Sequence, residues 1–135
     1  MHELICYTDG AQSNGCAGIG VVFVMDDKII HTYSKHFEGI TNNQAELLAV
    51  TSALNFVNKP IKKLTIVTDS QYVLGCATKG WKRSKNKNYW RLYDKIYDAC
   101  SAFCSDIQFQ WVKGHNTDRF NELADKLAVK AKQND

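Results

Sequence analysis

The chain has 135 residues, of which 44% are apolar and one is proline, and it carries a formal net charge of +3. A chain of this length buries a core without disulfide or metal staples, so we expect a single domain over residues 1–135. No stretch approaches the ~20 apolar residues that cross a bilayer. No basic and apolar leader opens the chain either, so we expect a cytoplasmic monomer without membrane contacts.

The first part of the chain has the pattern of three antiparallel strands and a helix. Apolar runs at residues 4–8 and 19–25 and a half-buried alternation at 28–37 indicate the strands, which a loop at 14–18 and a turn at Asp26-Asp27 separate. Capping side chains at residues 41–43 and apolar residues at helical spacing up to Val57 predict a helix, which Lys59-Pro60 closes.

The remainder alternates strands and helices. Strands are predicted at residues 64–68 and 107–112, and helices at 71–77 behind an Asp69-Ser70 cap, from Asn88 onward, and from about Thr117 to Lys132. The helix that Asn88 caps should bury Leu92, Ile96, Ala99 and Phe103, and the last helix Leu123, Leu127 and the alanines at 124, 128 and 131. Right-handed crossovers then give an α/β fold with a five-stranded mixed sheet of order 3-2-1-4-5 and helices on both faces.

Two aspartates follow strands of this sheet. Asp9 lies where the first strand meets a glycine, and Asp69 lies directly after the fourth. In the predicted strand order these two ends adjoin at the switch point, where open α/β sheets bind ligands. Glu46 and Asp125 lie on helices next to alanines, which let a carboxylate approach the sheet. Taken singly, Glu46 and Asp125 could be solvent-facing charges and Asp69 a helix cap.

Four carboxylates in one crevice would repel each other unless a cation neutralised them. Oxygen ligands without a histidine or cysteine cluster favour Mg²⁺ or Mn²⁺ over zinc. Two such ions about 3.5–4 Å apart are the usual apparatus for in-line displacement at phosphorus. The five cysteines form no C-x-x-C pair, so we expect reduced thiols that pack as small apolar side chains.

The positive charge of the chain is concentrated in one segment. Residues 70–92 contain no acid and six basic side chains, Lys79, Lys82, Arg83, Lys85, Lys87 and Arg91, so the rest of the chain carries −3. Trp81, Tyr89 and Trp90 lie among them. A charge run is commonly a solvated face, but basic residues mixed with aromatic ones also suit a polyanion surface.

Five motifs in order carry a resemblance to a known family. They are Tyr7-Thr8-Asp9-Gly10-Ala11, Thr41-Asn42-Asn43-Gln44-Ala45-Glu46-Leu47, Thr68-Asp69-Ser70-Gln71-Tyr72-Val73, Trp111-Val112-Lys113-Gly114-His115 and Asn121-Glu122-Leu123-Ala124-Asp125. Together they resemble type 1 ribonuclease H, whose members cut the RNA strand of RNA/DNA hybrids. The likeness covers nearly the whole chain, and five ordered motifs are far more specific than a lone Thr-Asp-Gly.

The resemblance implies roles for individual residues. Asp9, Glu46, Asp69 and Asp125 would hold two Mg²⁺ ions, for which Mn²⁺ could substitute. One ion would activate the attacking water and the other would stabilise the leaving 3′-oxygen, giving 5′-phosphate and 3′-hydroxyl ends. His115 matches a loop histidine that shuttles a proton or helps product leave, and a histidine beside glycine titrates near neutral pH, which suits either role. It could also be a surface residue without a task.

The resemblance also maps substrate contacts. Asn14, Asn42 and Gln71 match positions that contact the minor groove and the RNA 2′-hydroxyls, and Thr41 and Asn88 resemble positions that grip a DNA-strand phosphate. Thr41, Asn42 and Asn88 also have helix-capping explanations. The extra basic helix of many members is missing, because Thr78-Lys79 runs directly into Gly80-Trp81. We therefore expect salt-dependent binding through the basic segment, including Lys82 and Arg83.

Three alternatives stay open. A DNA-directed nuclease of the transposase or resolvase kind shares the acid cluster, and hydrolysis of all-DNA substrate would identify it. A catalytically dead hybrid-binding module would have lost one of the four acids, but none is lost here. The same domain also occurs at the end of reverse transcriptases.

Overall fold

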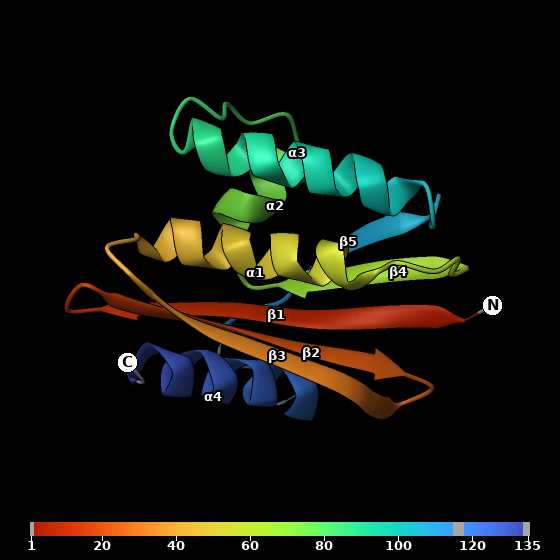
Figure 1. The fold of residues 1–135 in the computed structure, drawn as a ribbon, viewed down its shortest axis with the longest axis horizontal. Helices are drawn as coiled ribbons and strands as arrows, with labels where there is room; N and C mark the ends of the chain where they lie inside the picture. Colours follow the sequence, from red (N-terminus) through yellow and green to blue (C-terminus); the bar gives the residue numbers. More distant parts are fainter. Residues whose placement is uncertain (1, 115–117, 134–135) are drawn as a thin grey trace.

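The computed structural model describes residues 2–114 and 118–133. The strands are β1 (Glu3–Ser13), β2 (Cys16–Met25), β3 (Lys28–Glu38), β4 (Lys63–Thr68) and β5 (Ile107–Trp111). The helices are α1 (Asn42–Phe56), α2 (Gln71–Thr78), α3 (Lys87–Ser101) and α4 (Arg119–Gln133). Figure 1 shows α1, α2 and α3 on one face of the sheet and α4 on the other.

The sheet has the predicted order β3-β2-β1-β4-β5. The hairpin pairs β1–β2 and β2–β3 are antiparallel, while β1–β4 and β4–β5 are parallel. The predicted fold class is therefore confirmed. The parallel strands β1, β4 and β5 bring their carboxyl ends to one edge, which is the position that the acid cluster requires.

Helix α4 lies unusually close to the sheet because β2 presents glycines to it. A Cβ on Gly20 would lie 2.3 Å from the carbonyl oxygen of Ala124 and 2.8 Å from the backbone nitrogen of Ala128. Gly20 is also the cross-strand partner of Asp9. The close approach therefore sets how far the side chain after Ala124, which is Asp125, lies from β1.

The first strand is longer than its apolar run predicts. It continues past Asp9 to Ser13, because β2 starts at Cys16 and only Asn14 and Gly15 form the turn, both at positive φ. The predicted loop at residues 14–18 and the end of the strand at Thr8 were wrong. The parallel ladder with β4 nevertheless ends at Tyr7 and Val67, so Asp9 still lies just beyond it.

Three further expectations differ from the structure. Helix α3 follows Asn86 in a left-handed conformation, so Asn88 lies inside its first turn and does not cap it. Its buried face consists of Trp90, Tyr93 and Cys100. The predicted inner residues Leu92 and Phe103 are 44% and 38% exposed, and Ala99 is exposed as well. Strand β3, predicted to be half-buried, is a sheet edge with mostly exposed side chains.

Several other fold expectations are confirmed. Thr41 caps α1 and Ser70 caps α2, and α4 buries its predicted alanines. All five cysteines are free thiols and four of them are buried. Within the described residues, no helix combines the length and apolar character that crossing a membrane requires.

Candidate active site

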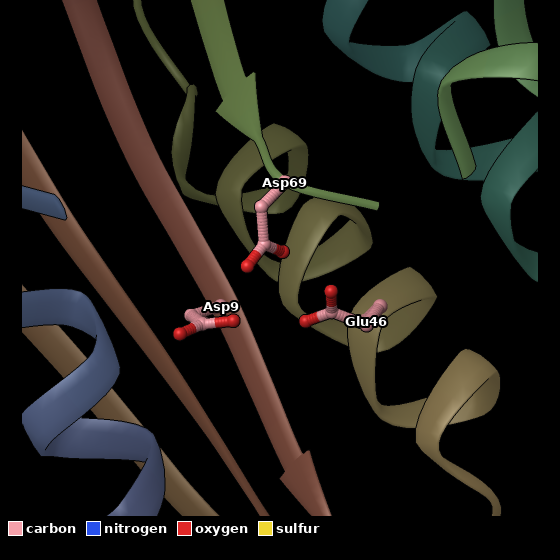
Figure 2. Close-up of side chains that lie close together, drawn as sticks. All are labelled: Asp9, Glu46 and Asp69. Atoms are coloured by element: carbon pink, nitrogen blue, oxygen red, sulfur yellow. The ribbon is translucent and has the colours of Figure 1, made fainter. Parts of the chain in front are cut away.

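Three carboxylates from different elements meet at the open end of the sheet. Asp9 comes from β1, Glu46 from the first turns of α1, and Asp69 from the residue after β4. One oxygen of each lies within 4.8 Å of the others, and Figure 2 shows the three side chains pointing toward one another. The predicted proximity of Asp9 and Asp69 is confirmed, although 60 residues separate them in the chain.

The backbone around these acids is held in place by hydrogen bonds between elements. The Thr8 hydroxyl donates to the carbonyl of Val67 at 2.8 Å, where the β1–β4 ladder ends. The Trp111 indole N–H donates to the carbonyl of Asp69 at 3.2 Å. The backbone N–H of Gly10 donates both to Asp9 Oδ1 at 2.9 Å and to Glu46 Oε1. A single donor thus orients two of the acids.

Glu46 and Asp69 do not serve the ordinary purposes that their positions suggest. Glu46 is 6% exposed, so it is not a solvent-facing helix charge. Ser70 caps α2 through its hydroxyl, which accepts from Val73 N at 3.1 Å. Asp69 is therefore free of capping, and its Oδ1 is buried without a hydrogen-bond partner in the described structure.

Asp125 lies outside the three-acid cluster but beside it. It lines the same cleft, which has a volume of about 180 Å³ and is bounded by Thr8, Asp9, Asp69, Gly114, Asn121, Glu122 and Asp125. A hydrogen bond to Asp125 is one of the causes that raise the pKa of Asp9. The structure therefore places Asp9, Asp69 and Asp125 on one cleft, and Glu46 lies next to Asp9 and Asp69.

Burial and mutual repulsion keep protons on these acids when no cation is present. Burial, followed by the charge of Asp69, raises the pKa of Asp9 to about 8. Burial, followed by a hydrogen bond that protonated Glu46 donates to Asp69 and by the charge of Asp9, raises the pKa of Glu46 to about 11. Among the residues that the structure describes, no basic side chain contributes to either shift.

The cluster fits a hard divalent cation. Its donors are all carboxylate oxygens, one of them is buried without a partner, and the repulsion among them is what a cation would relieve. A search of the described residues for acids, histidines and cysteines close enough to share a metal ion finds this cluster. Neither histidine nor cysteine belongs to it, which argues against zinc.

The predicted substrate residues are found in different settings. Thr41 caps α1, its hydroxyl accepting from Gln44 N at 3.1 Å, and Asn42 and Gln71 are the exposed first residues of α1 and α2. Asn14 occupies the β1–β2 turn. Their contacts with a substrate stay a prediction.

The basic residues divide into two kinds. Lys82 is exposed, whereas Arg83 is partly buried and bonded to other residues. Asn88, a neutral residue predicted to hold a phosphate, is also exposed. His115, predicted to move a proton, lies outside the described residues, and its neighbour Gly114 lines the cleft.

The sequence did not reveal a hydrogen-bonded chain of side chains next to the site. Gln44 donates to Asn86, which in turn donates to Tyr72. The sequence does contain a signal for one link of this chain, because Thr41 and Gln44 have the spacing of a capping box. The partner 42 residues away had no local signature.

An α/β sheet with a cluster of carboxylates at its switch point is typical of metal-dependent enzymes that act on phosphate esters, nucleases among them. The family model described as RNase H matches residues 1–133. The chain is 35% identical to a ribonuclease H of Trichodesmium erythraeum, covering 97% of this chain and 89% of that one. It is 39% identical to a ribonuclease H of Dinoroseobacter shibae, covering 95% and 90%. The chain therefore belongs to the ribonuclease H family and is a hydrolytic nuclease that cuts RNA in RNA/DNA hybrids.

Solved structures agree with this assignment. RNase H1 of the archaeon Halobacterium salinarum is 27% identical, with a TM-score of 0.74 over 96% of each chain. LC11-RNase H1 in complex with an RNA/DNA hybrid has a TM-score of 0.76 at 23% identity, which shows the fold. A prototype foamy virus protease-reverse transcriptase matches over 99% of this chain but 21% of its own length, with a TM-score of 0.76.

Proposed function

We propose that Asp9, Glu46, Asp69 and Asp125 hold two Mg²⁺ ions, with Mn²⁺ able to substitute, and that the enzyme leaves 5′-phosphate and 3′-hydroxyl ends. The observation that carries the proposal is the buried carboxylate cluster with an unpartnered Asp69 oxygen at the open end of the sheet. When bound, the ions supply Lewis acidity for attack on phosphorus and for the departing oxygen.

Asp9 is the central member of the site. It shares the Gly10 N–H with Glu46, and the charge of Asp69 and a hydrogen bond to Asp125 both raise its pKa. This position between the other acids makes it the ligand that we expect both ions to share. The Gly10 N–H donates to both Asp9 and Glu46 and so orients the two carboxyl groups in the metal-free structure.

The surrounding polar residues would select the substrate. We assign Asn14, Asn42 and Gln71 to the minor groove and RNA 2′-hydroxyls. All three are polar side chains: Asn42 begins the helix that carries Glu46, Gln71 begins the helix that follows Asp69, and Asn14 lies in the turn after β1. Thr41 and Asn88 would hold a DNA-strand phosphate. We assign the proton transfer or product release to His115, which follows the cleft residue Gly114.

The proposal extends to the state of the protein. We expect a monomer, because one chain supplies all four acids. We expect a cytoplasmic location, because five free thiols suit a reducing compartment.

The test uses end-labelled RNA/DNA hybrid, duplex RNA and duplex DNA, each with and without Mg²⁺. The expected result is metal-dependent cutting of the hybrid's RNA strand alone. Asp69→Asn serves as the site control, because it keeps the size of the side chain but removes the charge. Cutting of duplex DNA would support the DNA-directed alternative, and equal activity of Asp69→Asn would refute the site.

A further inference from the structure

The loop between α2 and α3 carries exposed positive charge without any helix or strand of its own. This basic loop, residues 79–86, contains Lys79, Lys82, Arg83 and Lys85. It lies on the α3 side of the molecule in Figure 1. Irregular charged loops commonly lack contacts and sample many conformations. This loop instead has three separate attachments to the helices.

The first attachment is at the end of α2. The carbonyl of Gly75 accepts hydrogen bonds from the backbone nitrogens of Lys79 at 2.9 Å and Trp81 at 3.2 Å. The Trp81 ring lies directly against Gly75, where a Cβ would come within 2.1 Å of it. Only glycine at this position lets the ring pack so closely, and the start of the loop is thereby docked on α2.

The second attachment is the guanidinium group of Arg83. Its Nε donates to the carbonyl of Cys76 at 3.1 Å and its Nη1 donates to Asp94 Oδ1 at 2.7 Å. Its central carbon lies 4.4 Å from the centre of the Trp90 ring and 5.6 Å from that of Tyr93. One side chain thus joins the loop to α2 through its edge and to α3 through both its edge and its face.

The third attachment is at Asn86, the last residue of the loop. Gln44 Nε2 donates to Asn86 Oδ1 at 2.9 Å, and Asn86 Nδ2 donates to the Tyr72 hydroxyl at 3.0 Å. That hydroxyl also accepts from the Trp90 indole N–H at 2.9 Å. Gln44 Oε1 accepts from the backbone N–H of Thr41 at 2.9 Å.

Both ends of this chain of bonds are groups that can only donate, a backbone N–H and an indole N–H, so the orientation of every amide between them is determined. The chain links the end of the loop to the turn of α1 that carries Glu46. The position of the loop is therefore defined relative to the acid cluster.

The lysines of the loop behave differently from Arg83. Lys79, Lys82 and Lys85 are exposed, and within the described residues their side chains make no ion pair or hydrogen bond. We infer that Arg83 is a positioning residue. It locks the basic loop, so that Lys82 and Lys85 are already in place when they meet the phosphates of a nucleic acid. The inference rests on the proposed function and replaces the expectation that Arg83 contacts phosphate.

Preorganisation has a physical advantage for this chain. Ordering a flexible loop on binding would subtract from affinity, whereas a loop that is already ordered keeps the full value of its phosphate contacts. The chain lacks the extra basic helix of many family members, as Thr78-Lys79 continues directly into Gly80-Trp81. A locked loop would compensate for the missing helix with few residues.

The first test separates the effect of the charge of a side chain from its effect on the position of the loop. Arg83→Lys keeps the charge but cannot reproduce the forked bonds and the stacking, so KM for a hybrid should rise about fivefold while kcat and the salt dependence stay unchanged. Lys82→Met should raise KM and reduce the slope of log KM against log salt by about 0.9, the loss of one phosphate contact. An Arg83→Lys enzyme with the KM of the wild type, or an Arg83→Met enzyme whose slope falls as in Lys82→Met, would overturn the inference.

The second test needs no nucleic acid. Trypsin cuts after lysine and arginine, and Arg83→Lys leaves the number of its sites unchanged. Released from its attachments, the loop of Arg83→Lys should be cut about tenfold faster than that of the wild type, whereas Lys82→Met should not accelerate cleavage. Cleavage after Lys126 on α4 should be unchanged in both variants, which separates local release from global unfolding.

The two tests also separate this inference from the proposed function. Faster tryptic cleavage of Arg83→Lys together with a wild-type protein that does not cut hybrids would leave the lock intact and refute the function. Hybrid cleavage by the wild type with an Arg83→Lys loop as resistant as the wild-type loop would refute the lock alone.

Discussion

The acid cluster and the basic loop treat charge in opposite ways. In the cluster, carboxylates are buried together and Asp69 Oδ1 has no hydrogen-bond partner in the described structure. In the loop, the partly buried charge, Arg83, has several partners and the remaining lysines are exposed. The difference indicates which charges the protein satisfies itself and which it leaves for a ligand. The carboxylates of the cluster need a cation to balance their charge, whereas Arg83 in the loop already has its partners before a polyanion binds.

The largest effect should come from the centre of the cluster. Asp9→Asn should reduce hybrid cleavage by about a thousandfold or more, since electrostatic stabilisation dominates such sites. The same change should leave the fold intact and raise the melting temperature in the absence of divalent ions, because it removes repulsion. Cleavage assays and thermal unfolding check both halves, and an active Asp9→Asn enzyme would contradict the site at its centre.

A smaller loss of activity should follow from a substitution that displaces Asp125 but leaves its side chain unchanged. Gly20→Ala would place a Cβ against the backbone of α4 and push that helix outward. We expect kcat to fall about 10- to 100-fold, because misplacement by an ångström is enough for such a loss. More Mn²⁺ should also be needed for the same thermal stabilisation.

Gly39→Ala is the matched control for that change. Gly39 has a positive φ, so alanine strains the backbone there as well, but no atom would lie within 4 Å of its Cβ. It should lower stability while leaving the metal requirement unchanged. Equal metal requirements in Gly20→Ala and the wild type would show that the α4 spacing does not set the site.

Stability should depend on pH in a direction that the cluster determines. The pKa values of Asp9 and Glu46 are raised to about 8 and about 11, so the metal-free folded state holds protons that the unfolded state releases above pH ~4. Stability without metal should therefore fall as pH rises from about 4 through about 8. Thermal unfolding at pH 5 and 8.5 in EDTA should show a drop of a few degrees, which Mg²⁺ reduces. A melting temperature in EDTA that rises over this range would contradict the buried-acid account.

The smallest effect concerns the loop, where two explanations predict opposite changes in KM for the same substitution. Asp94→Asn weakens an ion pair with Arg83 whose side chains are 31% and 55% exposed, so at most about 1 kcal/mol is involved. Simple electrostatics predicts tighter hybrid binding, because a negative charge is lost. The lock predicts a KM up to about twofold higher, and a lower KM at low salt would favour the purely electrostatic account.

Most of the architecture was readable from local patterns. Alternation of period two, helical spacing after Thr41 and the two crossovers were enough to predict the strand order and the meeting of Asp9 with Asp69. These features are local, or follow from the chirality of the chain, so they need no knowledge of partners. The motif set added the family, which the comparisons confirm.

Other features depended on neighbours that the sequence does not name. The apolar residues of α3 allow more than one buried face, and the packing of Trp90 and Tyr93 under Arg83 selected one that leaves Leu92 exposed. The extent of β1 depended on how far β2 extends beside it, since strand ends are set by pairing.

Arg83 shows the same division between sequence and structure. By itself the sequence determined that a charge lies at this position in a basic, aromatic segment of a ribonuclease H. Only the tertiary structure decided that this charge faces Cys76 and Asp94, because a hydrogen bond forms where the fold brings a donor and an acceptor within about 3 Å, and sequence spacing does not encode that distance. The exposed lysines beside it have no such partners in the described structure and stay available to a phosphate backbone.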